Sequence, residues 1–155
     1  MTDPCQPLRA LLAQAQRQRD HALAELHRLD AARLAADRQA EQLLLYRREH
    51  EARWQAQFRL EGRMELVHCH QGFMERLGDA IAQQLRIAAH AATQVERAAA
   101  IVRAHEIRTS ALDELIGRRL RESRRAADRS EQKETDDFAA RAAWHRTARY
   151  GATIL

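Results

Sequence analysis

The chain has 155 residues, a net charge of +4 and a composition that suits long helices better than a globular core. Hydrophobic residues make up 45% of it but aromatic residues only 5%, and 31 residues are alanine, which buries little apolar area. Such a mixture, with only 5 glycines and 2 prolines, is typical of a coiled coil. It argues against a thick core and against the deep cavity that an enzyme usually needs.

The positive charge is confined to the last quarter of the chain. Up to Ile116 there are 16 basic and 16 acidic residues, and from Gly117 on there are 10 basic and 6 acidic ones. An excess of this kind suits nucleic acid, an acidic protein surface or an anionic membrane.

Three sequence features argue against a secreted or membrane-spanning protein. Cys5 and Cys69 lie far apart, without metal-ligand spacing or a disulfide framework, which suits a reducing compartment. No run approaches the roughly 18 apolar residues of a membrane-spanning helix. Residues 1–7 lack the basic start and apolar run of a secretion signal.

The first predicted helix covers about residues 7–60. Pro4 and Pro7 precede its first periodic residue, Leu8, and proline is tolerated in the first turn of a helix. Two apolar patterns compete along this helix, one with a period of seven and one with a period of eleven. The rows are Ala15, Ala22, Leu29, Ala36 and Leu43, and Leu12, Leu23, Leu34 and Leu45. Because an eleven-residue repeat opposes a left-handed supercoil, we expect irregular winding.

The chain is predicted to turn at about residues 61–72. Its first glycines are Gly62, Gly72 and Gly78, and each costs a helix interior about 0.5–1 kcal/mol relative to alanine. The second helix is then predicted to run from about residue 73 to about residue 150.

The second helix carries the strongest pattern, a heptad repeat sustained from Met74 to Ile116. Six of the seven residues at its first position are apolar. The two rows are Met74, Ile81, Ala88, Val95, Val102, Thr109 and Ile116, and Leu77, Gln84, Ala91, Ala98, His105 and Leu112. A stripe this narrow cannot bury itself, so it needs another helix beside it.

These elements predict an all-α fold, a long antiparallel two-helix coiled-coil hairpin with an overhanging C-terminal helix. Residues 1–155 would form a single domain. Arms of roughly 50 and 75 residues would be about 80 and 110 Å long, so the basic region after about Leu120 would overhang. A parallel homodimer of one very long helix is the alternative, which the glycine cluster disfavours.

Metal binding and catalysis find little support in the sequence. Neighbouring residues such as His68, Cys69 and His70 point in different directions on a helix, and a closed zinc site needs four ligands. The eight histidines are scattered, and no phosphate-binding glycine loop or nucleophile motif occurs. We therefore expect no metal, no cofactor and no catalytic residues.

A run of arginines follows the heptad repeat. It comprises Arg118, Arg119, Arg121, Arg124, Arg125 and Arg129. Such a run binds phosphates in nucleic-acid proteins, but it also suits an acidic protein surface or a solvated helix face. No aromatic residues are interleaved with it for base stacking, so nucleic acid is not the expected partner.

Most of the large aromatic residues lie around the predicted turn, at Tyr46, Trp54, Phe58 and Phe73. They would either pack the end of a hairpin or form a partner site, because aromatic residues concentrate binding energy. One helix face near this tip overlaps only in part with the heptad rows, so part of it is expected to face outward. The face comprises Phe73, Leu77, Ala80 and Gln84.

Three stretches together resemble the FliJ family. Residues 131–143 are similar to its Gln-Lys-x-x-Asp-x-Phe-Ala ending, and residues 43–50 to its Leu-x-x-Tyr-x-x-Glu block. Residues 73–83 are similar to its Phe-x-x-x-Leu-x-x-Ala-Ile block. Order, spacing and length agree over nearly the whole chain. The stretch 67–70 lacks the family's usual aromatic residue, and the tail after Ala143 is longer than is typical.

The resemblance implies a non-enzymatic, cytoplasmic stalk of a type III export apparatus, peripheral at the inner membrane through its partners. Those partners would be the export ATPase hexamer, the membrane export gate and export chaperones. By position, the gate would bind Phe73, Leu77, Ala80 and Gln84. The ATPase would bind a set at the basic end, namely Arg121, Arg124, Arg125, Gln132, Lys133, Asp136 and Phe138.

Other functions stay open at this point. The injectisome counterpart, the YscO-type stalk, shares the fold and role, and the sequence does not separate it from the flagellar protein. A nucleic-acid-associated coiled coil and a homo-oligomerising scaffold are the two alternatives from other classes. A hairpin is expected to be a monomer in isolation, whereas a scaffold is not.

Overall fold

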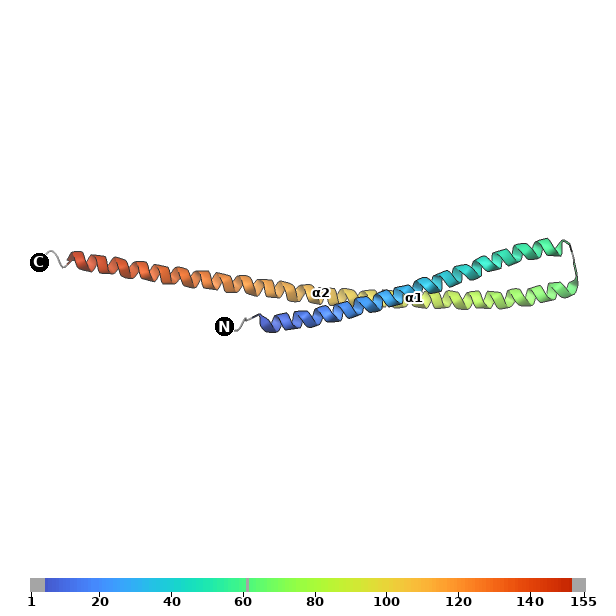
Figure 1. The fold of residues 1–155 in the computed structure, drawn as a ribbon, viewed down its shortest axis with the longest axis horizontal. Helices are drawn as coiled ribbons and strands as arrows, with labels where there is room; N and C mark the ends of the chain where they lie inside the picture. The colour runs from blue at the N-terminus through green and yellow to red at the C-terminus, as the bar shows by residue number, and fades with distance from the viewer. Residues whose placement is uncertain (1–4, 61, 152–155) are drawn as a thin grey trace. The chain divides into compact units, whose positions relative to one another are not determined.

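The computed structural model describes residues 5–60 and 62–151, with the helical backbone alone for residues 147–151. Two helices make up almost all of this range, α1 (Gln6–Phe58, 53 residues) and α2 (Met64–Gly151, 88 residues) (Figure 1). They pack against each other, and the described ranges contain no strand. The predicted all-α class is therefore confirmed.

The chain divides into two compact units, and each helix contributes residues to both. One is Ala15–Ile107, and the other combines Met1–Gln14 with Arg108–Leu155. The single hairpin domain over residues 1–155 stays a prediction.

Within Ala15–Ile107 the two helices run antiparallel. The Gln84 Nε2 atom on α2 donates a hydrogen bond to the backbone carbonyl of Ala36 on α1, at 3.1 Å. Further along α1, Trp54 stacks on His70, with ring centroids 4.0 Å apart. Residues later in α1 therefore contact residues earlier in α2, as expected for an antiparallel pair.

The heptad pattern of α2 is confirmed by burial. Both predicted rows supply the side chains that lie between the helices in this unit, and we call these buried rows the seam. Its most buried members on α2 are Leu77, Ile81, Gln84, Ala88, Ala98 and Val102. Their spacing lets one stripe of a long helix stay against its partner.

On α1 the heptad pattern prevails over the eleven-residue one. Ala15 and Ala36 are buried, as is Ala40, whereas Leu34 and Leu45 are exposed. A row of arginines spaced fourteen apart, Arg19, Arg33 and Arg47, also lies half-buried along the seam. Arg19 and Arg33 reach acidic residues of α1 with their guanidinium groups, whereas the Nε atom of Arg47 is buried without a hydrogen-bond partner. Long basic side chains often cover apolar surface with their stems.

The turn is shorter than predicted, and the second helix begins earlier. α2 starts at Met64, so the predicted turn at residues 61–72 and the predicted start near residue 73 are wrong. Gly62 lies in the connection, but Gly72 and Gly78 are helical. Two helical glycines cost only about 1 kcal/mol each, which the aromatic contacts of His70 and Phe73 with α1 offset.

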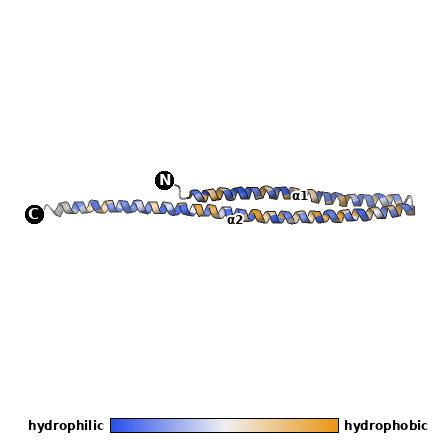
Figure 2. Ribbon diagram, turned by 90° about the horizontal axis from the view of Figure 1, so that it is seen from below, coloured by the Kyte–Doolittle hydropathy of each residue, from blue (hydrophilic) through white to orange (hydrophobic). Residues whose placement is uncertain are grey.

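In the other unit, burial stops well before α2 ends. Cys5, Thr109 and Ile116 are buried, and Leu112 and Leu120 are half-buried. From Arg121 to Arg146 every side chain is exposed. We call this stretch the exposed segment, and Figure 2 shows it mostly in hydrophilic colours. It stays helical because alanine, arginine and glutamate favour the helix intrinsically.

Candidate interaction surfaces

The first candidate surface is an aromatic cluster where α1 ends and α2 begins, which we call the tip cluster. On α1, Tyr46, His50 and Trp54 are spaced four residues apart and so share one face. His70 of α2 stacks between Trp54 and His50, with ring centroids 4.0 and 5.4 Å away. Phe73 completes the cluster, 4.5 Å from His50 and 6.3 Å from Tyr46. Aromatic contacts of this kind stabilise beyond their buried area.

An open hollow of about 320 Å³ lies beside the tip cluster. Its lining is mainly apolar and aromatic, with a guanidinium at one edge. The residues are His50, Trp54, Gln57, Leu66, Cys69, His70, Phe73 and Arg76. A hollow of this size accommodates a side chain of a partner protein.

His70 packs between the rings of His50 and Trp54 in the tip cluster. Its Nδ1 atom is buried without a hydrogen-bond partner. Burial lowers the pKa of His70 below its usual value, nearby His50 lowers it further, and Glu51 opposes the change. The lowered pKa favours the neutral ring, which suits stacking between two flat neighbours.

The predicted gate-binding residues divide between the seam and the surface. Leu77 and Gln84 are buried in the seam, and Gln84 bonds to the α1 backbone. Ala80 is exposed, and Phe73 is half-buried against Tyr46 and His50. Ala80 and the edge of Phe73 are thus the outward part of this face.

The predicted ATPase-binding residues all lie in the exposed segment. They are Arg121, Arg124, Arg125, Gln132, Lys133, Asp136 and Phe138. Phe138 is 76% exposed, and Trp144 further along is 71% exposed. Phe138 lines an open hollow of about 320 Å³ with Arg141, Ala142 and His145. The segment thus combines arginines with accessible aromatic rings, a combination that is common in binding sites.

The described ion pairs connect residues of α1 with one another. Arg33 bridges Asp30 and Asp37, each at 3.0 Å, and Arg28 contacts Glu25 at 2.6 Å. Arg19 contacts Asp20 at 2.8 Å. These local pairs, which range from exposed to half-buried, support the α1 helix by a few tenths of a kcal/mol each.

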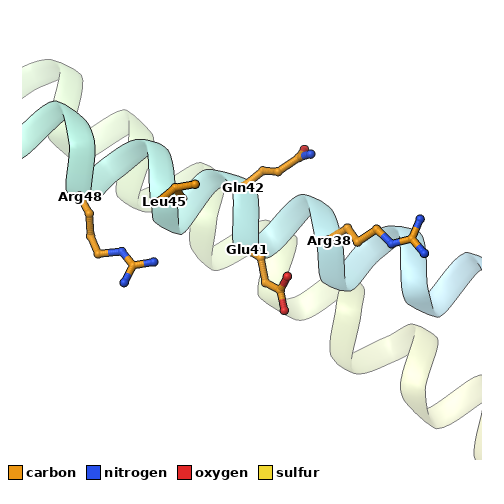
Figure 3. A pocket seen from close by; sticks show the side chains of 5 residues that line it. All are labelled: Arg38, Glu41, Gln42, Leu45 and Arg48. Carbon is orange, nitrogen blue, oxygen red and sulfur yellow. The ribbon is translucent and has the colours of Figure 1, made fainter.

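A third hollow, of about 400 Å³, lies on the outside of α1. Its five lining side chains all come from α1, as Figure 3 shows. They are Arg38, Glu41, Gln42, Leu45 and Arg48. The mixture of both charges around one exposed leucine is typical of an ordinary solvated helix face.

Neither a metal centre nor a membrane span is found in the part of the chain that the structure describes. No three His, Cys, Asp or Glu side chains of residues 5–60 and 62–151 are grouped to hold a metal. Cys69 and His70 line the hollow beside the tip cluster, whereas His68 is exposed and does not line it. No described helix is long and apolar enough to cross a membrane.

A comparison with protein families shows the kind of protein to which these two surfaces belong. The family model described as flagellar FliJ protein matches residues 5–148. The chain belongs to the FliJ family. No match was found among curated proteins or among solved structures.

The FliJ family is a non-enzymatic part of the cytoplasmic flagellar export machinery, and membership makes the chain a flagellar export-apparatus protein. The resemblance inferred from three short sequence blocks is thereby confirmed over nearly the whole chain.

Sequence reasoning missed the two histidines of the tip cluster. His50 lies between Tyr46 and Trp54 at helical spacing, which was a usable signal. His70 was weighed only with its immediate neighbours as a metal ligand, and its stacking partners lie on the other helix. The fourteen-residue spacing of Arg19, Arg33 and Arg47 is a further sequence signal for the face of α1 that meets α2.

Proposed function

We propose that this FliJ-family chain is a non-enzymatic central stalk that links the ring of the export ATPase to the membrane export gate. The observation that carries the proposal is the exposed segment, a helical stretch of arginines and accessible aromatic rings at one end of α2. A stalk needs a stiff rod with different chemistry at its two ends, and the tip cluster supplies the second end.

The proposed geometry is a hairpin with an overhanging C-terminal helix. α1 has 53 residues and α2 has 88, which correspond to about 80 and 130 Å at 1.5 Å per residue. Because α1 is too short to accompany α2 along its whole length, the end of α2 is left to enter a ring-shaped partner.

The ATPase would bind the exposed segment through charge and apolar contacts. Arg121, Arg124 and Arg125 would meet acidic side chains of the ring, since arginine forms paired bonds with carboxylates. Phe138 would bury its ring in the partner, because aromatic residues supply much of the binding energy of interfaces. Gln132, Lys133 and Asp136 would add polar contacts beside it.

The gate would bind at the tip, through Ala80 and the exposed edge of Phe73. Leu77 and Gln84 would act from the seam by holding this face of α2 in place. Export chaperones are the third proposed class of partner. The chain would then be cytoplasmic, a monomer in isolation, and peripheral at the inner membrane through its partners.

The proposal is tested by reversing charge in the exposed segment. Arg121→Glu, Arg124→Glu and Arg125→Glu together should weaken binding to the purified export ATPase by at least about tenfold, because each contact to a charged group is worth about 1.5–3 kcal/mol. The matched control reverses three exposed arginines of α1, Arg38, Arg48 and Arg53, and should change binding less than about twofold.

Equal binding by the first triple variant and the wild type would contradict the proposed role of the basic end. Retention of DNA with a steep salt dependence, lost in the same variant, would instead support the nucleic-acid alternative.

A further inference from the structure

α2 carries more apolar surface within Ala15–Ile107 than its seam uses. One residue before successive seam positions lie Ile87, Gln94 and Ile101, which we call the outer row. Ile87 is 48% exposed and Ile101 is 54% exposed. Figure 2 shows hydrophobic residues recurring along this part of α2. A helix whose apolar stripe is wider than the two seam rows normally contacts a second neighbour.

The α1 residues on the same flank leave the outer row open. Tyr46 of α1 lies against Phe73, which precedes Ile87 by two heptads. The antiparallel register then brings Ala32 nearest to Ile87, and alanine is too short to cover an isoleucine. Further along, the acid on this flank, Glu25, is ion-paired with Arg28.

The opposite flank of the same pair of helices has a different character. Arg33 bridges Asp30 and Asp37 there, so charged groups border the seam. Two-stranded coiled coils normally carry such charges on both flanks. On α2 that opposite flank carries Leu85, which is 47% exposed, so the outer row differs from it in having two exposed isoleucines and no Asp-Arg-Asp bridge on α1.

The far border of the outer row on α2 carries two arginines and no acid, and we call it the basic border. Four residues before each of its members, at heptad spacing, come Gln83, His90 and Arg97, with Arg76 one heptad earlier. All four are exposed, and no acid interrupts them. A neighbour that covers the outer row must bring its own border against these groups.

We propose that the outer row docks an amphipathic helix of a partner protein, whose apolar side is bordered by acidic residues. The heptad spacing of Ile87 and Ile101 matches the spacing of another helix, and the basic border selects its charge. A second copy of this chain fits less well, because symmetric packing would oppose the two basic borders. The outer row continues the heptad row of Phe73 and Ala80, but it contains no residue of the proposed gate-binding or ATPase-binding sets, so variants of Ile87 and Ile101 test it separately from them.

The test uses the full chain and a synthetic helical peptide about three heptads long, with leucine at the seam positions and glutamate at the flanks. A twin peptide carries lysine in place of glutamate. Fluorescence anisotropy measures the Kd of each, and circular dichroism checks that every variant stays helical.

The double variant Ile87→Ser, Ile101→Ser should weaken binding of the glutamate peptide by at least about tenfold, since buried apolar anchors dominate such interfaces. The matched control is Ile107→Ser, because Ile107 is 70% exposed on another face; it should change the Kd less than about twofold. Arg97→Glu should weaken binding at low salt and much less at 1 M salt, where charges are screened.

The proposal is overturned if the glutamate peptide does not bind, or if the lysine twin binds as tightly. It is also overturned if Ile107→Ser weakens binding as much as the double variant does. Sedimentation of the unliganded chain provides the fourth check. A dimer that the double variant disperses would make a second copy the occupant and would also overturn it.

Discussion

The paired part of α2 and the exposed segment are stretches of one continuous helix, but different interactions support them. Between Leu77 and Val102 the helix is held by side chains buried against α1. Between Arg121 and Arg146 every side chain is exposed, so the helix relies there on the intrinsic helix propensity of its residues. The contrast teaches that the seam determines where the two helices pair. Beyond the pairing, α2 stays helical because its residues favour the helix intrinsically.

The largest expected difference in stability between the two stretches comes from creating a cavity in the seam. Ile81 is buried, so Ile81→Ala should lower the free energy of unfolding by about 2–4 kcal/mol. Phe138→Ala in the exposed segment removes more atoms but should change the free energy by less than about 0.5 kcal/mol. Urea denaturation followed by circular dichroism measures both, and equal losses would contradict the difference in support.

Removing a tryptophan compares the tip cluster with the exposed segment. Trp54 is half-buried and stacked on His70, so Trp54→Ala should cost about 1–2 kcal/mol, less than for a fully buried ring. Trp144→Ala should cost less than about 0.5 kcal/mol, because Trp144 is exposed. A larger loss from Trp144→Ala in the same thermal or urea unfolding experiment would mean that the exposed segment is packed.

A single polar contact in the seam can be tested in the same way. Gln84→Ala removes the hydrogen bond to the Ala36 carbonyl and some buried stem, which should cost about 1–2 kcal/mol. Gln94→Ala is the matched control, because Gln94 contacts only its neighbour His90 among the described bonds. The control should stay within about 0.5 kcal/mol of the wild type, and a loss as large as that of Gln84→Ala would argue against a role for the buried bond.

The smallest expected effect is a pH dependence that arises at the tip cluster. Burial and His50 lower the pKa of His70 in the folded chain, so the unfolded chain takes up a proton first as the pH falls. The contribution is complete above the ordinary histidine pKa of about 6.5 and is lost as the pH falls below it. Of the charged groups around the ring, Glu51 opposes the lowering of the His70 pKa, and Arg76 lines the hollow beside it.

The measurement is the urea midpoint of the wild type and of His70→Gln between pH 7.5 and 5. The wild type should lose stability relative to the variant as the pH falls. His145→Gln in the exposed segment is the control and should follow the wild type. Parallel curves for the wild type and His70→Gln would show that this ring is not the source.

Periodicity was sufficient to predict the helices and the seam of α2, because burial of one stripe is the main requirement for two long helices to pack. It was not sufficient to place the start of α2. Glycine counts suggested a long turn, but Gly72 and Gly78 remain helical because His70 and Phe73 gain contacts with α1 that are distant in sequence. Which of two competing patterns α1 would use was likewise decided by its partner helix.

The candidate surfaces divide in a similar way. The exposure of Arg121 and its neighbours follows from the end of the apolar repeat, which is visible in the sequence. The division of the tip face, with Gln84 turned inward and Ala80 outward, follows from the heptad rows, which contain Gln84 and not Ala80. The rows could not give the residues that these side chains meet, because the Ala36 carbonyl that binds Gln84 lies on the other helix.

Hydrogen exchange of the full chain, with and without the purified export ATPase, tests the central claim most directly. Alone, amides between Leu77 and Val102 should exchange slowly and those between Arg121 and Arg146 quickly, because only the former are supported by the seam. Added ATPase should then protect the Arg121–Arg146 stretch and leave the seam unchanged. Equal protection of both stretches without ATPase, or no change in the second stretch when ATPase is added, would contradict the account.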